Sequence, residues 1–395
     1  MFLDSQDLQY IFDNIPFKKP NVYPKIKVST QNLHLDFLKD SGIKFDVTDT
    51  KNKKIKNINI FRLDGSLLNT VTNPNYPTNS KFGIRLAGNK IKTEERLKAF
   101  NLRTTNSKIY KIEDKKKAFS DLNIENDKRV VIKPLNGTMG RGVFVNVNRD
   151  RFDSCWDLTS KIPNSSHGIL VQDFLSGFEV RVTIMEGNIV SLLLRIPPYV
   201  IGDGISDVNT LIKVKNKERA KCGYLKNLLI TIDDKIVEFL KSNSTSLNDI
   251  PDSGEYFLLS SVSNISNGGE LIDITNLVSE NIKDFALDIL AAMPGLFTGG
   301  LDIMITSFDD PSPSLIEVNT YPVIALPTYP TYGNSRNPSK FYYESLIALE
   351  QAKNFSKYKY NIENAEYYLS GYLKFIERKI HLLNRNNLKH LDILM

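Results

Sequence analysis

The sequence predicts an α+β fold with two or three layers of secondary structure. Short apolar runs typical of strands alternate with amphipathic stretches typical of helices, and their arrangement does not fit one uniform parallel sheet. Hydrophobic residues make up 41% of the 395 residues, so the chain can bury a substantial core. Its length suits two to three domains of roughly 150 residues each. These observations exclude a disordered or fibrous protein.

Residues 1–79 are expected to form a small N-terminal α/β unit. Short apolar runs predict its strands, an amphipathic run predicts a helix, and a stretch rich in turn formers at 73–79 closes the unit. The predicted elements are strands at 26–28, 43–47 and 58–61 and a helix at 33–38.

Most of the predicted strands lie in the middle of the chain, which we divide into expected units at 80–170 and 171–340. Helices are predicted over 90–100 and 280–292. The predicted strands are 129–134, 142–147, 168–172, 179–185, 189–195, 255–261, 300–306 and 314–319.

The last segment, 341–395, is predicted to be helical, with its basic end forming a solvated face rather than a membrane or RNA element. Apolar side chains recur there at helical spacing, so one face is expected to pack on the body. These residues are Leu369, Tyr372, Phe375, Ile376, Ile380 and Leu383.

Composition excludes several classes of function. The two cysteines, Cys155 and Cys222, cannot form a disulfide framework or a Cys-rich zinc site, and the four histidines show no HxxxH spacing. A net charge of +6 does not by itself indicate nucleic-acid binding. Neither a long apolar run nor a signal-peptide pattern occurs, so we expect no membrane span and a cytoplasmic location.

A glycine-rich segment separates two predicted strands and follows Lys133. Gly137, Gly140 and Gly142 would let backbone N–H groups approach an anion, and the lysine adds a positive charge suited to phosphate. The spacing matches the outer glycines of a Walker A loop, but Lys-Ser/Thr is missing and a strand follows instead of a helix. A phosphate-binding loop and an ordinary hairpin turn therefore both stay open.

Two carboxylates and an amide lie on the last predicted strands. Glu317 and Asn319 are two residues apart and share one face of their strand, and Asp302 lies on the preceding strand. Such an all-oxygen set suits Mg²⁺, which keeps water and phosphate oxygens as further ligands. Because a carboxylate in an apolar strand needs a partner, a metal site is the favoured interpretation and a structural salt bridge is the alternative.

From about residue 80 to 332 the chain carries a series of short motifs. The most specific is RIPPYVIGDG at 195–204. The others are Asn89-Lys90, the strand ending at Lys133-Pro134 with its glycines, the segment 171–181, Asn267-Gly268-Gly269, Asp273-Ile274-Thr275, residues 300–303 and residues 317–322. In this order they resemble the ATP-grasp superfamily, and within it the ligase modules of cyanophycin synthetase and of bifunctional glutathione synthetase.

The resemblance implies an ATP-grasp fold in which two α+β subdomains grip ATP. The small lid subdomain with the glycine-rich loop would be 80–170 and the catalytic subdomain 171–340. The unit 1–79 would be a pre-ATP-grasp-like domain, and 341–395 a helical extension. The chain has no room for the second domain of either enzyme, so neither substrate is carried over.

The resemblance also implies roles for individual residues. Lys90, Lys133, Gly137, Gly140 and Gly142 would bind the phosphates. Gln172, Phe174, Leu175 and Glu179 would hold adenine and ribose, although Gln172 stands where a glutamate is frequent. Two Mg²⁺ ions would lie on Asp302, Glu317 and Asn319. Arg181 and Arg195 would hold the substrate carboxylate or the oxyanion. Lys90 and Lys133 would offset charge on the transferring phosphoryl group, and Asn267 would orient substrate or phosphate.

The function implied is an ATP-dependent carboxylate–amine ligase that forms an amide or peptide bond through an acyl phosphate. Its partners would be a small acid and a small amine, an amino acid or a peptide, without nucleic acid or membrane, and a homo-oligomer stays open. One alternative is a ligase that modifies or cyclises a ribosomal peptide. Another is a non-catalytic nucleotide-binding module, against which the retained lysines and carboxylates argue.

Overall fold

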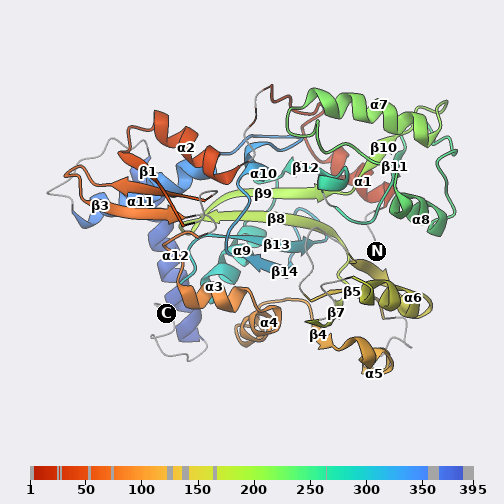
Figure 1. Cartoon of the computed structure of the whole chain (residues 1–395), viewed down its shortest axis with the longest axis horizontal. Coiled ribbons are helices and arrows are strands. Elements are labelled where there is room, and N and C mark those ends of the chain that lie inside the picture. The colour runs from red at the N-terminus through yellow and green to blue at the C-terminus, as the bar shows by residue number, and fades with distance from the viewer. Residues whose placement is uncertain are drawn as a thin grey trace.

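The computed structural model describes residues 4–24, 26, 29–51, 55–72, 75–121, 128–135, 142–162, 167–263, 265–354 and 364–385. The loop glycines Gly137 and Gly140 lie outside these ranges, and of the predicted strand at 26–28 only residue 26 lies within them. Within them the strands form four sheets (Figure 1).

A five-stranded antiparallel sheet, the central sheet, forms the middle of the molecule (Figure 1). Its order is β12-β9-β8-β13-β14. The strands are β8 (Phe178–Met185), β9 (Asn188–Ile196), β12 (Glu270–Asp273), β13 (Gly299–Ile305) and β14 (Ser314–Asn319). Side chains alternate between the faces of a strand, so apolar residues such as Val180 and Ile303 enter the main core while Arg181 and Asp302 lie on the other face.

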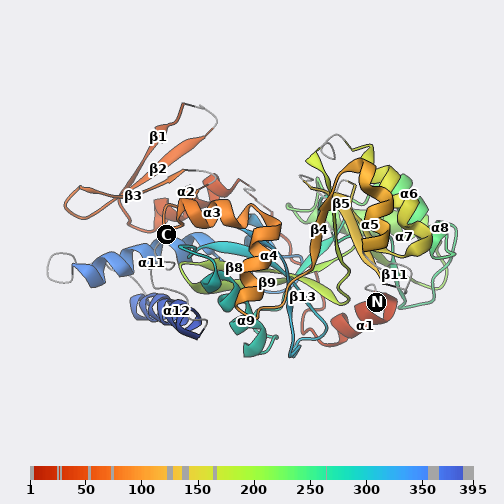
Figure 2. The same ribbon diagram turned by 90° about the horizontal axis from the view of Figure 1, so that it is seen from below.

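Helices cover the apolar face of the central sheet, as Figure 2 shows from below. They are α1 (Ser5–Asp13), α9 (Glu280–Ala292) and α12 (Ala365–Arg385). Leu8, Ile289 and Phe375, one from each helix, belong to the same core. The N-terminus of α1 is capped by a capping box between Asp4 and Asp7.

A four-stranded antiparallel sheet stands at one end of the central sheet, with two helices packed on it (Figure 2). Its order is β4-β7-β5-β6. The elements are β4 (Ser107–Tyr110), β5 (Val130–Pro134), β6 (Phe144–Val147), β7 (Ile169–Asp173), α5 (Lys115–Asp121) and α6 (Arg149–Ser160), preceded by the short turn η1 (Ile112–Asp114). Ile132, Phe152 and Trp156 form a separate core there, so this part has a hydrophobic core of its own.

A three-stranded antiparallel sheet projects at the other end (Figure 2). It consists of β1 (Phe45–Asp49), β2 (Lys56–Phe61) and β3 (Leu67–Thr72), and it packs with α2 (Thr30–Asp40) and α11 (Pro338–Lys353). The first 79 residues are thus divided between two cores, because Leu8 belongs to the main core and Ile58 to this second one. The predicted division of the chain into units stays a prediction.

The remaining elements connect these parts. They are α3 (Lys81–Ala87), α4 (Lys90–Ala99), α10 (Ala325–Thr328) and η4 (Ile265–Asn267), together with a lobe of β10 (Tyr199–Ile201), α7 (Val208–Lys221), α8 (Asp234–Ser242) and β11 (Tyr256–Leu258). In the part of the chain described here, no helix has the length and apolar character that a membrane span requires.

The C-terminal helix α12 packs on the main core through Phe375 and Leu383, as predicted, but Ile380 does not take part in this packing. Ile380 is 37% exposed, and the neighbouring Lys379 is only 1% exposed. Lys379 Nζ donates to the carbonyls of Leu290, Ala291 and Met293 at 3.4, 3.2 and 3.0 Å. These carbonyls lie at the C-terminal end of α9, where backbone donors are scarce, and Lys379 Nζ supplies hydrogen bonds in addition to those that Leu290 and Met293 accept from the backbone.

Candidate active site

Two adjoining cavities lie between the four-stranded sheet and the polar face of the central sheet. The first, which we name the hinge cavity, has a volume of about 210 Å³. The predicted site residues that line it are Lys133, Gln172, Phe174, Leu175, Glu179 and Arg195. The second, the carboxylate cavity, has a volume of about 380 Å³ and is lined in part by Lys90, Glu317 and Asn319. Ile316 lines both, so the two cavities adjoin.

The hinge cavity has apolar walls with a few polar groups at its edge. Val131 and Val145 come from the four-stranded sheet, and Met304 comes from the central sheet. The segment 174–177 crosses between the two sheets beside Gln172, which is 4% exposed. Such a cavity suits a flat ring whose edge forms hydrogen bonds with backbone groups.

Arg181, Asp302 and Glu317 lie side by side on three adjacent strands. Asp302 is directly opposite Arg181 on β8 and Glu317 on β14. Arg181 Nε lies 3.0 Å from Asp302 Oδ1, and Arg195 Nη2 lies 3.6 Å from the same oxygen. Arg181 Nη1 is buried without a hydrogen-bond partner among the described residues, so it can bind an anion.

Arg195 forms an ion pair with Glu179 inside the hinge cavity. Glu179 also accepts a hydrogen bond from Ser263 Oγ at 2.6 Å. Burial opposes the charge on Arg195, yet Glu179 and Asp302 raise its pKa above the ordinary value. Arg195 is therefore held as a cation in the hinge cavity, and the ribose contact expected for Glu179 stays a prediction.

The charges of the carboxylate cavity depend on its lysines. Lys90 Nζ lies 3.4 Å from Glu317 Oε2. Burial acts to raise the pKa of Glu317, but Lys90 and Lys133 outweigh it and hold that pKa below its usual range. Burial raises the pKa of Asp302, although Arg181 acts in the opposite direction. Burial and the charge of Lys90 lower the pKa of Lys133 to about 8.

Comparison with known proteins identifies the family. A family model described as an ATP-grasp domain matches residues 87–322. The chain belongs to the ATP-grasp family. The matched range contains both cavities' lining strands and the hinge, and the predicted family and fold are confirmed.

The relatives of this ATP-grasp chain are larger proteins. Glutathione biosynthesis bifunctional protein GshAB of Clostridium perfringens (strain 13 / Type A) is 30% identical over 325 residues, which are 80% of this chain and 40% of that protein. Cyanophycin synthetase of Crocosphaera subtropica (strain ATCC 51142 / BH68) is 29% identical over 216 residues, 53% of this chain and 24% of that protein. The chain thus spans less than half the length of these relatives.

A solved structure supports the ATP-grasp fold. The crystal structure of a bifunctional glutathione synthetase from Pasteurella multocida aligns with a TM-score of 0.54 at 24% identity. The alignment covers 82% of this chain and 43% of that one. At this identity the likeness concerns the fold alone.

The donor set of this ATP-grasp site fits Mg²⁺ bound together with phosphate. Asp302 and Glu317 face each other across β13 and β14, and Asn319, which lies on the same face of β14 as Glu317, lines the carboxylate cavity with it and can offer its amide oxygen. The described residues contain no group of three or more His, Cys, Asp or Glu side chains that could hold a metal alone. Two carboxylates and an amide leave the remaining positions to water and phosphate oxygens, as Mg²⁺ prefers.

The environment of Gly142 differs from the phosphate-binding one predicted for it. Gly142 has φ +69°, and a Cβ there would lie 2.7 Å from Ile162 Cγ1 and 3.2 Å from Pro134 Cγ. Packing against these side chains explains the glycine without a phosphate contact. Gly137 and Gly140 lie outside the described residues. Asn267 lies in the exposed turn η4, away from both linings.

Two functional-site residues escaped the sequence analysis. Glu94 lines the carboxylate cavity and Thr105 lines the hinge cavity, and they are 6% and 1% exposed. The available signal was the spacing of Glu94, four residues after Lys90 and three before the buried Leu97, which places a carboxylate on the inner face of the helix.

Proposed function

We propose that this protein is an ATP-dependent, ADP-forming carboxylate–amine ligase that acts on an amino acid or a peptide through an acyl phosphate. The observation that carries the proposal is the convergence of Lys90, Lys133, Glu317 and Asn319 on two adjoining cavities, with Asp302 directly opposite Glu317. Relatives named for glutathione biosynthesis and for cyanophycin synthesis support the same reaction class.

The nucleotide would extend from the hinge cavity into the carboxylate cavity. The base would lie between Val131 and Met304 with Gln172 and the backbone of 174–177 at its edge. The phosphates would then pass Ile316 toward Lys133 and Lys90. The two ammonium groups would offset the negative charge that is shared among the phosphate oxygens, which is the main requirement in phosphoryl transfer.

Asp302, Glu317 and Asn319 would hold Mg²⁺, and we expect two ions. When bound, the metal neutralises charge on the phosphates and aligns them. Lys90, at 3.4 Å from Glu317, keeps that carboxylate ionised and ready to bind a cation.

The chemistry requires two displacements. A carboxylate oxygen of the first substrate attacks the γ-phosphorus of ATP, which releases ADP and leaves an acyl phosphate. The nitrogen of the amine then attacks the acyl carbon, inorganic phosphate leaves and the nitrogen loses a proton. Arg181 Nη1 and Arg195 would hold the first carboxylate and the oxyanion of the second step. No enzyme nucleophile is required, and both cysteines are buried and free.

The experiment is a screen for ADP release over amino acids and peptides, offered in pairs as acid and amine with ATP and Mg²⁺. The expected result is ADP release that depends on both substrates, with a product heavier than either substrate alone and identified by mass spectrometry as their amide. ATP binding without ADP release for any pair would instead indicate a non-catalytic nucleotide-binding module and would overturn the proposal.

A further inference from the structure

The helix α4 carries two charged residues of the carboxylate cavity on one face. Lys90 is its first residue, and Glu94 follows one turn later. Residues four apart on a helix are neighbours on its surface. The ammonium of Lys90 lies 3.4 Å from Glu317 Oε2 on β14. The carboxylate of Glu94 is directed to another part of the chain.

Both oxygens of Glu94 accept hydrogen bonds from the segment 105–107. Oε1 accepts from Thr105 Oγ1 at 2.7 Å and from Ser107 Oγ at 2.5 Å, and Oε2 accepts from the backbone N–H of Ser107 at 2.8 Å. This segment leads directly into β4, the first strand of the four-stranded sheet. Three donors on one buried carboxylate make a strong attachment, because hydrogen bonds to a charged group are roughly twice as strong as neutral ones.

The same segment also forms hydrogen bonds with the other connection between the two sheets, where the chain leaves the four-stranded sheet. The chain enters the four-stranded sheet through 105–107 and leaves it after Asp173, the last residue of β7. Asn106 Nδ2 donates to Asp173 Oδ2 at 2.5 Å, and the N–H of Asp173 donates to the carbonyl of Asn106 at 3.3 Å. On the body side, the N–H of Thr105 donates to the carbonyl of Leu315 on β14 at 3.3 Å.

The segment 105–107 is thus a junction between three parts: α4 with Lys90, the end of β7 beside the hinge, and β14 two residues before Glu317. Lys133 lies on the far side of this junction, on β5 of the four-stranded sheet. The distance between the two phosphate-site lysines consequently depends on how the four-stranded sheet is attached to α4.

We propose that Glu94 is a positioning residue that fixes the four-stranded sheet relative to α4 and thereby sets the spacing of Lys133 and Lys90 around the nucleotide. The inference rests on the proposed function, since it names a further residue of that site. A carboxylate suits this position because all three of its partners donate. A glutamine would turn an N–H₂ group toward donors and leave part of the junction unpaired.

The test compares three variants with the wild type. Glu94→Gln keeps the size of the side chain and removes one acceptor oxygen, and Thr105→Val removes a single donor without changing shape. Glu95→Gln is the control, because Glu95 is the exposed neighbour on the same helix. Binding of Mg-ATP is measured by calorimetry, ADP release by steady-state kinetics, and the junction by hydrogen exchange of the peptide covering 104–110.

For Glu94→Gln the expected result is a rise of about tenfold in the KM and Kd for ATP, equivalent to about 1.4 kcal/mol. The kcat should fall less than the KM rises, because the reacting groups are unchanged. Thr105→Val should give a smaller rise in the same direction, and Glu95→Gln none. Exchange at 104–110 should be faster in Glu94→Gln and unchanged in the control.

Two outcomes would overturn the inference. Unchanged ATP affinity in a folded Glu94→Gln protein would show that the junction does not set the nucleotide site. A lower melting temperature with normal KM would reduce Glu94 to a structural role. If the wild type itself fails to bind Mg-ATP, it is the proposed function that fails, and the faster exchange at 104–110 in Glu94→Gln still tests the junction separately.

Discussion

Lys133 is the residue whose charge is most sensitive to the conditions of the site. It extends from β5 into the hinge cavity, where burial and the charge of Lys90 lower its pKa to about 8. A lysine loses its charge above its pKa. In the protein without nucleotide, the positive charge of Lys133 is therefore present at neutral pH and is lost in mildly alkaline solution.

This gives a pH prediction for ATP use. The kcat/KM for ATP should fall above about pH 8, because kcat/KM reports the ionisation of the free enzyme. Lys133→Arg keeps a positive charge at these pH values, so its profile should stay flat through the same range even if its maximum is lower. An equally steep fall in Lys133→Arg would assign the ionisation to another group.

The carboxylates give a second prediction at this scale. Asp302→Asn and Glu317→Gln should each lower Mg-dependent ADP release by about 10²–10³-fold, because each removes a charge from the proposed metal set. Asp309→Asn, at an exposed position just beyond β13, is the control. Near-normal turnover in both variants, with folding checked by circular dichroism, would contradict the metal assignment.

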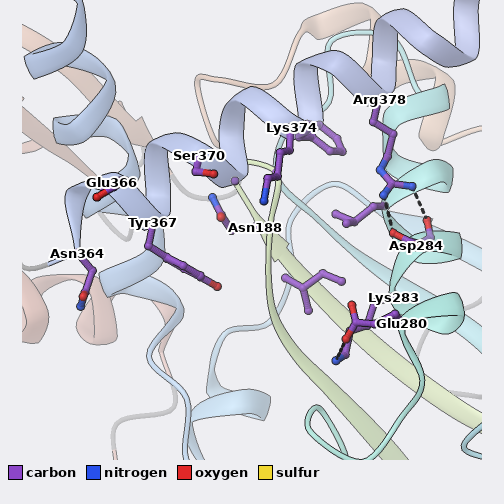
Figure 3. A pocket seen from close by; sticks show the side chains of 15 residues that line it. Asn188, Glu280, Lys283, Asp284, Asn364, Glu366, Tyr367, Ser370, Lys374 and Arg378 are labelled. Atoms are coloured by element: carbon purple, nitrogen blue, oxygen red, sulfur yellow. Dashed lines mark hydrogen bonds and ion pairs between the residues drawn. The ribbon is translucent and has the colours of Figure 1, made fainter.

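At the scale of elements, the helix α12 is fixed by contacts along its whole length. In Figure 3, Arg378 reaches Asp284 on α9, with Nη2 at 2.5 Å from Oδ1, while Asn188 lies beneath the start of the helix near Ser370. Asn188 Nδ2 donates to the carbonyls of Glu186 at 3.2 Å and Tyr368 at 3.5 Å. The groove that remains between α9 and α12 has a volume of about 820 Å³ and lies on the side of the central sheet opposite the active site.

For Gly371→Ala we predict a change in the free energy of unfolding opposite in sign to the change that helix propensity favours. Gly→Ala inside a helix ordinarily stabilises by about 0.5–1 kcal/mol. Here a Cβ would lie 1.8 Å from Asn188 Oδ1, so Asn188 must move and lose its hydrogen bonds. We expect Gly371→Ala to destabilise by about 1–3 kcal/mol in denaturant unfolding. Ser370→Ala, the neighbouring substitution, is the control, and a stabilised Gly371→Ala would disprove this packing.

Individual elements show how far the sequence could predict this molecule. The alternation of apolar and polar residues predicted β8, β13 and β14, and the structure has these strands at nearly the expected bounds. Hydrophobic periodicity predicts that one face of a helix is buried, but it does not identify the elements against which that face packs. It therefore could not show that α1 joins the main core, or that Lys379 is buried against the end of α9.

The candidate site was predictable to a similar extent. Glu317 was named from strand geometry and Arg181 from the family resemblance, and the structure brings both together with Asp302. Glu94 was missed because a charged helix residue ordinarily faces water. Its burial depends on partners at 105–107 that only the folded chain supplies. The catalytic and ligand roles of all these residues stay predictions.

At the scale of the whole molecule, the site depends on how two sheets with separate cores are joined. The exit crossing contains Gly177, which has φ +116°, and a Cβ there would lie 2.2 Å from the carbonyl oxygen of Ile305. Because that oxygen belongs to the backbone of β13, it cannot move aside without displacing the central sheet. Gly177 therefore sets how closely the crossing approaches the body.

Substituting this glycine should separate nucleotide binding from the stability of the sheets. Gly177→Ala is expected to raise the Kd for Mg-ATP by at least about tenfold, since displacement of the crossing distorts the hinge cavity. Gly254→Ala is the matched control, because it also has a positive φ, +85°, but has no atom within 4 Å of its Cβ. Equal effects of the two substitutions on Kd would mean that backbone strain alone, about 1–3 kcal/mol, accounts for the change.

The main core has a consequence for biosynthesis of the chain. Leu8 and Ile11 from α1 share this core with Phe375 and Leu383 from α12. Domains generally fold as units while the ribosome is still translating, beginning from the N-terminus. The strands of the central sheet lie between residues 178 and 319, so they leave the exit tunnel before α12 can cover their apolar face. The nascent protein must therefore carry an incompletely covered hydrophobic surface until residue 383 has emerged, and chaperone dependence should be greatest at that stage.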